Sequence, residues 1–267
     1  MKYLLSFILL FSLVAYGQTS EEYVERGITK SFWQDYRGAI SDYNKAIELN
    51  PKSELAYASR GSAKFYLQDY RGAISDWNKV IELNPKFVSL YAGRGRAKYK
   101  LQDYRGAMSD YNKAIELDPK NAEAYYNRGI AKAYLEDYSG AISDYSKAIE
   151  LNPKNADAYG YRGIAKEKLQ DYRGAISDWN KVIELDPKSA GAYYKRGVAK
   201  GSLGDYRGAI SDYNKAIELY PKFADAYYNR GVAKINLGQK DSGCLDFSKA
   251  GELGNENAYD EIRELCN

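Results

Sequence analysis

The chain has 267 residues with 28 Tyr, 23 Gly and no His, a bias that is typical of a repeated unit. Its 39 basic and 36 acidic side chains are interspersed and leave a net charge of +3, whereas a dedicated nucleic-acid binder needs a basic stripe against phosphate. Without His the chain lacks the commonest general base and metal ligand, and two Cys cannot make a Cys-only zinc site. We therefore expect no catalytic residue, no metal and no cofactor.

Residues 1–17 have the pattern of a bacterial type secretory signal peptide. Lys2 is the only charge before Glu21, and the run Leu4–Val14 is apolar apart from two serines. The small residues Ala15 and Gly17 follow, and we expect signal peptidase to cleave after Gly17. The apolar run is shorter than the roughly 20 residues that span a bilayer, so we favour a cleaved signal over an uncleaved membrane anchor. The expected protein is exported, periplasmic or secreted, with no membrane span after cleavage.

A unit of 34 residues then recurs seven times. The step is plainest in the prolines, which are Pro51, Pro85, Pro119, Pro153, Pro187 and Pro221. We divide residues 18–257 into repeats at about 20–53, 54–87, 88–121, 122–155, 156–189, 190–223 and 224–257.

Each repeat contains two helical patterns. In the fourth repeat we expect a first helix over about 122–135, capped by Asn121, and a second that follows Asp137 as its N-cap and ends near Leu151. Gly129 on the first helix is small enough to let the two backbones approach closely. Such a hairpin cannot bury its apolar faces alone, so neighbouring repeats must stack.

These residues resemble the tetratricopeptide repeat. The fourth repeat carries its pattern as Tyr125 in the usual Trp place, Gly129, Ala141, Tyr145, Ala148 and Pro153. The resemblance implies an all-α, right-handed superhelical solenoid of helical hairpins, which the polar segment 258–267 closes as a C-terminal capping helix. Two positions depart from the family pattern, because Arg128 replaces the usual Leu and Lys132 replaces the usual Tyr.

Basic columns recur at the places of Arg128 and Lys132 in all seven repeats. Residues four apart share one helix face, so these like charges cost about 0.2–0.5 kcal/mol per repeat unless counter-charges lie nearby. The second helices offer Asp144 and Glu150 at the same step, and we predict that the Arg column pairs with the Asp column. The predicted ion ladder comprises Arg60, Arg94, Arg128, Arg162, Arg196, Asp76, Asp110, Asp144, Asp178 and Asp212. We favour this ladder over a catalytic or phosphate-binding stripe, because a column present in each repeat serves packing.

The repeats differ mainly on one face of the first helix. In tetratricopeptide proteins that face lines a concave groove that holds a ligand, often an extended peptide or a helix. The matching candidates here are Phe32, Phe65, Tyr66, Arg96, Tyr99, Lys100, Tyr126, Tyr134, Lys168, Tyr194 and Tyr228. Tyrosine suits such a surface because it joins apolar area to a hydrogen-bonding tip. For the aliphatic positions Ile130, Ile164, Val198 and Val232 the groove and the core remain equal alternatives.

Family co-chaperones grip a C-terminal carboxylate with a Lys and an Asn on the first helix of the domain and a Lys and an Arg on the third. The matching places here carry Val24, Ile28, Ser89 and Gly93, so the clamp is absent and binding of a cytosolic chaperone tail is disfavoured.

The two cysteines fall in the last repeat and in the capping helix. Cys244 and Cys266 would form a disulfide in an oxidising compartment; two free buried thiols are the alternative. Neither is expected to be catalytic, since no His is present to activate it.

The expected function is that of an exported, non-catalytic scaffold that binds a protein or peptide of unknown identity in the groove. A carbohydrate or cell-wall binding module is the alternative, because aromatic rings stack on sugars. A hydrolase with paired carboxylates is disfavoured, since each prominent acid belongs to a repeated column and an active site should be unique. The interspersed acids disfavour RNA binding.

Overall fold

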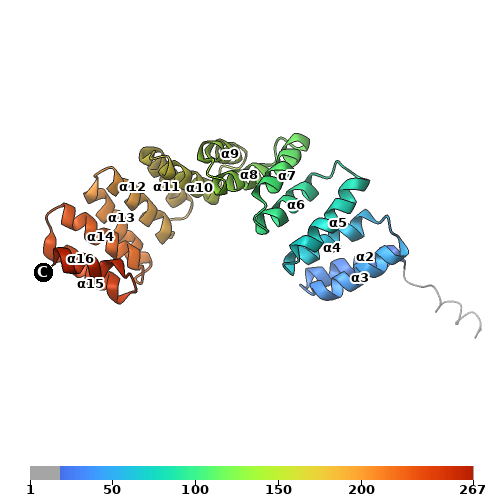
Figure 1. The fold of residues 1–267 in the computed structure, drawn as a ribbon, viewed down its shortest axis with the longest axis horizontal. Coiled ribbons are helices and arrows are strands. Elements are labelled where there is room, and N and C mark those ends of the chain that lie inside the picture. Colours follow the sequence, from blue (N-terminus) through green and yellow to red (C-terminus); the bar gives the residue numbers. More distant parts are fainter. Residues whose placement is uncertain (1–18, 267) are drawn as a thin grey trace, which may run out of the picture. The chain divides into compact units, whose positions relative to one another are not determined.

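Helical hairpins make up the part of the chain that the computed structural model describes, residues 19–266, in which there are fifteen helices and no strand (Figure 1). The predicted all-α fold of stacked helical hairpins is confirmed. The predicted signal peptide, residues 1–17, lies outside the described residues. No helix within 19–266 is both long and apolar enough to cross a membrane.

The chain divides into two units, the first ending at Pro119 and the second beginning at Lys120. In both, the first helix of each repeat has an even label and the second helix an odd one. The first unit contains α2 (Ser20–Phe32), α3 (Tyr36–Leu49), α4 (Glu54–Tyr66), α5 (Tyr70–Leu83), α6 (Val88–Lys100) and α7 (Tyr104–Leu117). The second contains α8 (Ala122–Tyr134), α9 (Tyr138–Leu151), α10 (Ala156–Lys168), α11 (Tyr172–Leu185), α12 (Ala190–Ser202), α13 (Tyr206–Leu219), α14 (Ala224–Asn236), α15 (Lys240–Glu252) and α16 (Asn257–Leu265).

Local hydrogen bonds fix where the helices begin. Asp137 caps α9, because its carboxylate accepts the backbone N–H of Gly140 at 2.9 Å. The same Asp-to-Gly cap opens α3, α5, α7, α11 and α13. Asn121 caps α8 by accepting the N–H of Ala124 at 2.9 Å. The caps satisfy backbone donors that the first turn of a helix leaves without partners.

The turn inside each hairpin places a residue in the left-handed region. After α6, the N–H of Gln102 donates to the carbonyl of Tyr99 and that of Asp103 to Lys98, both at 2.9 Å, which is a Schellman end. Gln102 therefore has φ of 62°. In the last two hairpins the same place is Gly204, at φ 79°, and Gly238, at φ 74°. Of the seven hairpin turns, these two alone use glycine, which adopts the left-handed conformation without steric cost.

We expect Gln102→Gly to stabilise the protein by about 0.5–1 kcal/mol. The left-handed conformation costs a residue with a side chain about 1–2 kcal/mol, and the greater freedom of glycine in the unfolded chain offsets part of that gain. Urea unfolding followed by circular dichroism measures the difference. The reverse change, Gly204→Gln, is the matched control and should lower the midpoint. A lower midpoint for Gln102→Gly would show that the turn is not strained.

The core of a hairpin is a glycine on the first helix facing an aromatic ring on the second. Ala141, Tyr145 and Ala148 on α9 are fully buried. A Cβ atom added at Gly129 on α8 would lie 2.7 Å from Cε1 of Tyr145, closer than atoms can approach. The two helices can therefore pack at this distance only because residue 129 has no side chain.

A disulfide joins the last two helices. Cys244 on α15 is bonded to Cys266, which follows α16, with Cα atoms 5.8 Å apart, and no cysteine of the described residues is free. Ala258 on α16 is fully buried against Phe247 and Ala250 of α15. The short final helix thus covers the exposed side of the seventh repeat.

Candidate binding face

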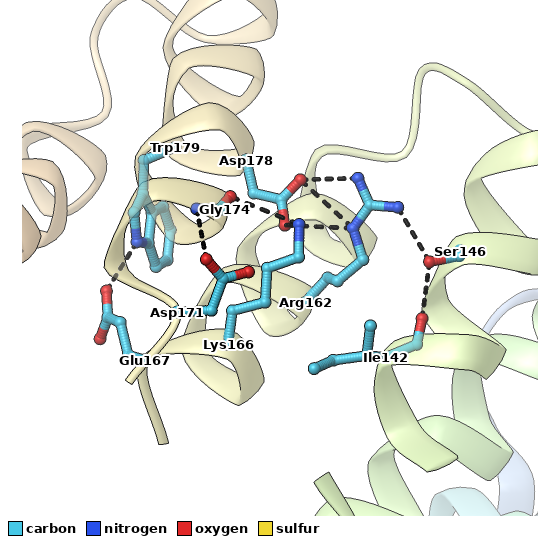
Figure 2. A network of polar contacts seen from close by, with 9 residues as sticks. All are labelled: Ile142, Ser146, Arg162, Lys166, Glu167, Asp171, Gly174, Asp178 and Trp179. Carbon is cyan, nitrogen blue, oxygen red and sulfur yellow. Dashed lines mark hydrogen bonds and ion pairs between the residues drawn. The ribbon is translucent and has the colours of Figure 1, made fainter. Parts of the chain in front are cut away.

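The Arg and Asp columns form ion pairs inside each hairpin. In the fifth repeat Arg162 on α10 donates from Nη2 to Oδ1 of Asp178 at 2.6 Å and from Nε to Oδ2 at 3.1 Å (Figure 2). Asp178 on α11 is only 2 % exposed. The same pairing joins Arg60 to Asp76, Arg94 to Asp110, Arg128 to Asp144 and Arg196 to Asp212, and it extends to Arg26 with Asp42 and Arg230 with Asp246.

The Lys column reaches the same carboxylates, which the sequence alone did not predict. Lys166 Nζ lies 2.8 Å from Oδ2 of Asp178 and donates to the carbonyl of Gly174 at 3.3 Å (Figure 2). Two cations four residues apart are tolerated because one buried carboxylate neutralises part of both charges. In the first repeat, the hydrogen bond from Arg26 holds the pKa of Asp42 below its usual range.

The Arg side chain also links adjacent repeats. Arg162 Nη1 donates to the hydroxyl of Ser146 on α9 at 3.0 Å, and Ser146 donates in turn to the carbonyl of Ile142 at 2.7 Å (Figure 2). Asn takes the place of Ser146 in the equivalent links of Arg60, Arg94, Arg196 and Arg230. One guanidinium therefore holds three helices together, and its charge serves packing.

The Glu column does not supply counter-charges to the first helices. Glu150 pairs instead with Lys147 three residues earlier on α9, at 2.7 Å, and both side chains are exposed. Such surface pairs contribute at most about 1 kcal/mol. Within residues 19–266 no group of His, Cys, Asp and Glu is arranged to hold a metal ion.

All residues predicted for the groove lie on first helices, and we call the surface that they form in each unit the first-helix face. In the first unit Phe32 and Tyr66 are 77 % and 64 % exposed. Phe65 is half-buried against Trp77, with ring centroids 6.1 Å apart, and the guanidinium of Arg96 lies 5.2 Å above its ring. The remaining members of this unit are Tyr99, half-buried beside Tyr104, and Lys100, which is exposed.

In the second unit the face divides into exposed and packed members. Tyr134 is 58 % exposed, and Lys168 is exposed as well. Tyr126, Tyr194 and Tyr228 are half-buried against second-helix rings, and burial raises the pKa of all three. The Tyr194 hydroxyl accepts a hydrogen bond from Asn229, and the Tyr228 hydroxyl donates one to a carboxylate of α16. These three tyrosines therefore expose only part of each ring to solvent.

The first-helix face of the second unit contains a cavity of about 360 Å³ between α10 and α12. Trp179 and Val182 of α11 line it together with Ile164 of α10 and Lys195 of α12. Sequence reasoning missed this cavity. The one available signal was Gly160, which also lines it and stands where the repeats on either side have a tyrosine.

Beside this cavity Glu167 is half-buried on α10. It accepts a hydrogen bond from Nε1 of Trp179 at 2.8 Å, which holds the indole in place (Figure 2). Burial raises the pKa of the Glu167 carboxyl, and the hydrogen bond from Trp179 opposes that shift.

Stacked helical hairpins with a varied face on the first helices define the chain as a helical-repeat protein. Family profiles described as tetratricopeptide repeat match residues 23–53, 122–155 and 145–177, and one described as TPR repeat matches 95–135, 168–204 and 201–238. The chain belongs to the tetratricopeptide repeat proteins. This fold supports a protein–protein interaction scaffold, and the family is generally non-catalytic.

Several solved structures share the fold. The MamA protein is 29% identical with a TM-score of 0.60, over 66% of this chain and 94% of that one. YrrB, described as a TPR protein with an unusual peptide-binding site, is 25% identical with a TM-score of 0.64, over 71% and 98% of the chains. A tetratricopeptide repeat protein from Parabacteroides merdae ATCC 43184, at 24% identity and a TM-score of 0.66, covers 93% of this chain and 99% of its own. No curated protein sequence matches the chain.

Proposed function

We propose that this chain is an exported scaffold that binds a protein or peptide partner on its first-helix face. The observation that carries the proposal is the division of roles between the helices. The charges that recur in each repeat are paired with one another, whereas Phe32, Tyr66 and Tyr134 on the first helices are 77 %, 64 % and 58 % exposed. Rigid aromatic side chains are frequent anchors of protein interfaces, because they bury much area at little cost in conformational entropy.

Site-specific photo-crosslinking tests the binding face. A benzoyl-phenylalanine placed at Tyr134 of the mature chain should capture a defined protein from envelope extract, detected as an adduct of fixed mass. The matched control carries the same group at Ser143, which is exposed on second helix α9 of the same repeat and should give no adduct. Adducts at Ser143 and none at Tyr134 would show that the partner binds the second helices, which contradicts the proposal. Retention on cell-wall sacculi without any protein adduct would favour the carbohydrate alternative.

Export is the second part of the proposal. It is supported by the pattern of residues 1–17 and by the disulfide Cys244–Cys266, since structural disulfides persist in oxidising compartments. Cell fractionation with mass spectrometry should find a chain that begins at Gln18 in the envelope or the medium. A cytosolic chain that retains residues 1–17 would contradict this part.

A further inference from the structure

In the second unit, a column of tyrosines on the first-helix face is interrupted in the fifth repeat. At the step of 34 the column reads Tyr126, Gly160, Tyr194 and Tyr228 in the second unit, whereas the first unit has Val24, Ala58 and Ala92 at this place. Each tyrosine packs on the second-helix ring of its own repeat: Tyr126 on Tyr145 at 6.2 Å, Tyr194 on Tyr213 at 6.0 Å and Tyr228 on Phe247 at 5.7 Å between centroids. The fifth repeat has the second-helix ring, Trp179, but no ring of its own at position 160 to cover it.

The second repeat also has a tryptophan on its second helix, and larger side chains pack against it. Its second helix α5 has the same sequence as α11, so Trp77 and Trp179 occupy equivalent places. Trp77 is packed with Phe65 and with the buried Leu90. The residues that correspond to this pair beside Trp179 are Glu167 and Ala192. Both indoles are buried, at 4 % and 6 % exposed, but Trp179 has a carboxylate and a methyl group where Trp77 has a phenyl ring and an isobutyl group.

The result is the cavity of about 360 Å³ between α10 and α12. A Cβ atom added at Gly160 would lie 3.4 Å from Cζ3 of Trp179 and 4.0 Å from Cγ2 of Val182, which is ordinary contact. The space directly beyond position 160 is therefore bounded by an indole and an aliphatic side chain. Its volume is near the lower end of the range of about 300–1,000 Å³ that ligand pockets occupy, so it suits a side chain better than a large cofactor.

Polar groups stand at the edge of this apolar cavity. Asp157, Asp186 and Lys195 are among the residues that line it. The two carboxylates are acceptors for a phenolic hydroxyl, and an ammonium group stabilises an aromatic ring whose face it approaches. An apolar floor with such an edge matches tyrosine, which has an apolar body and a hydroxyl at its tip.

We propose that this cavity receives a tyrosine side chain of the bound partner, which supplies in the fifth repeat the ring that the chain itself supplies in the fourth, sixth and seventh. The inference rests on the proposed function and adds to it the residue by which the partner is recognised. Trp179 forms the floor of the site, and the missing side chain of Gly160 provides the opening.

Nuclear magnetic resonance on the mature chain tests the site with the probe acetyl-Gly-Tyr-Gly-amide. The indole N–H signal of Trp179 should shift saturably on titration, while that of Trp77, which has Phe65 and Leu90 beside it, should stay in place. Acetyl-Gly-Ala-Gly-amide should shift neither signal. Gly160→Tyr restores the tyrosine column and should weaken probe binding at least tenfold. Ala192→Leu, which copies Leu90, should weaken it as well, so the test does not depend on one variant folding.

Partner capture separates this inference from the proposed function. With the crosslinker at Tyr134, Gly160→Tyr should reduce the yield of the partner adduct at least tenfold. An unchanged yield, or a Trp179 signal that responds equally to the Tyr and Ala probes, would overturn the tyrosine site and leave the scaffold standing. A crosslinker chain with Gly160 unchanged that captures no protein, together with a Trp179 signal that responds to the Tyr probe alone, would support the site and contradict the scaffold.

Discussion

Replacing Asp144 with alanine is expected to destabilise the protein by about 3 kcal/mol, at the lower end of the range for breaking a buried ion pair. Asp144 is 3 % exposed and accepts from Arg128 at 2.6 and 2.8 Å, and Lys132 Nζ lies 2.8 Å away. Without the carboxylate, two like charges face each other one turn apart beside the core. Both cations keep partial access to water, which limits the cost.

Urea unfolding measures this loss of stability, and two further variants serve as comparisons. Arg128→Ala should cost only about 1–2 kcal/mol, because Lys132 still neutralises the buried carboxylate. Glu150→Ala removes an exposed carboxylate from the same helix and should change stability by less than about 0.5 kcal/mol. Equal losses for Asp144→Ala and Glu150→Ala would show that burial of the ladder contributes nothing.

Gly129→Ala is expected to destabilise the protein by about 2–3 kcal/mol. Alanine normally favours a helix over glycine by up to about 1 kcal/mol, so the sign here depends on the space around the new methyl group. That group would lie 2.7 Å from Cε1 and 2.9 Å from Cδ1 of Tyr145, whose ring is fully buried and has no room to retreat. The clash exceeds the gain in propensity, and α8 must move away from α9.

Gly191→Ala is the matched control for that substitution. Gly191 also belongs to a first helix, in the first turn of α12, but a Cβ atom there would meet nothing within 4 Å. We expect this variant to gain about 0.5–1 kcal/mol from helix propensity. Thermal unfolding of the two variants should therefore move in opposite directions. A rise in both midpoints would mean that the hairpin packs more loosely than the structure shows.

The sequence was sufficient to predict the helices, their Asp and Asn caps and the partner of each Arg, because these features repeat and depend on local spacing. Arg128 and Asp144 are 16 residues apart in one hairpin, as are Arg162 and Asp178. That Lys132 contacts the same carboxylate was not predicted, since the sequence shows two cations on one face but not how far each side chain extends.

The binding face was harder to predict, because exposure on a first helix depends on the neighbouring repeats. Tyr134 and Tyr126 lie on the same helix, and both were predicted to line a groove. Tyr134 is 58 % exposed, whereas Tyr126 is half-buried between Tyr145 and Tyr161. The cavity beside Trp179 is harder still, because it results from a side chain that is absent. The size of the cavity depends also on the small side chains of α12 in the next repeat, so no pattern within one repeat predicts it.

The covalent closure of the last repeat affects how the chain resists degradation. Hairpins in a linear stack are held only by their neighbours, so terminal helices come loose first. The final helix contacts α15, and the bond between Cys244 and Cys266 spans 22 residues and anchors α16 to the seventh repeat. A carboxypeptidase that trims the chain therefore meets a cross-link at Cys266, and digestion of the intact protein should stall there until a reductant opens the loop.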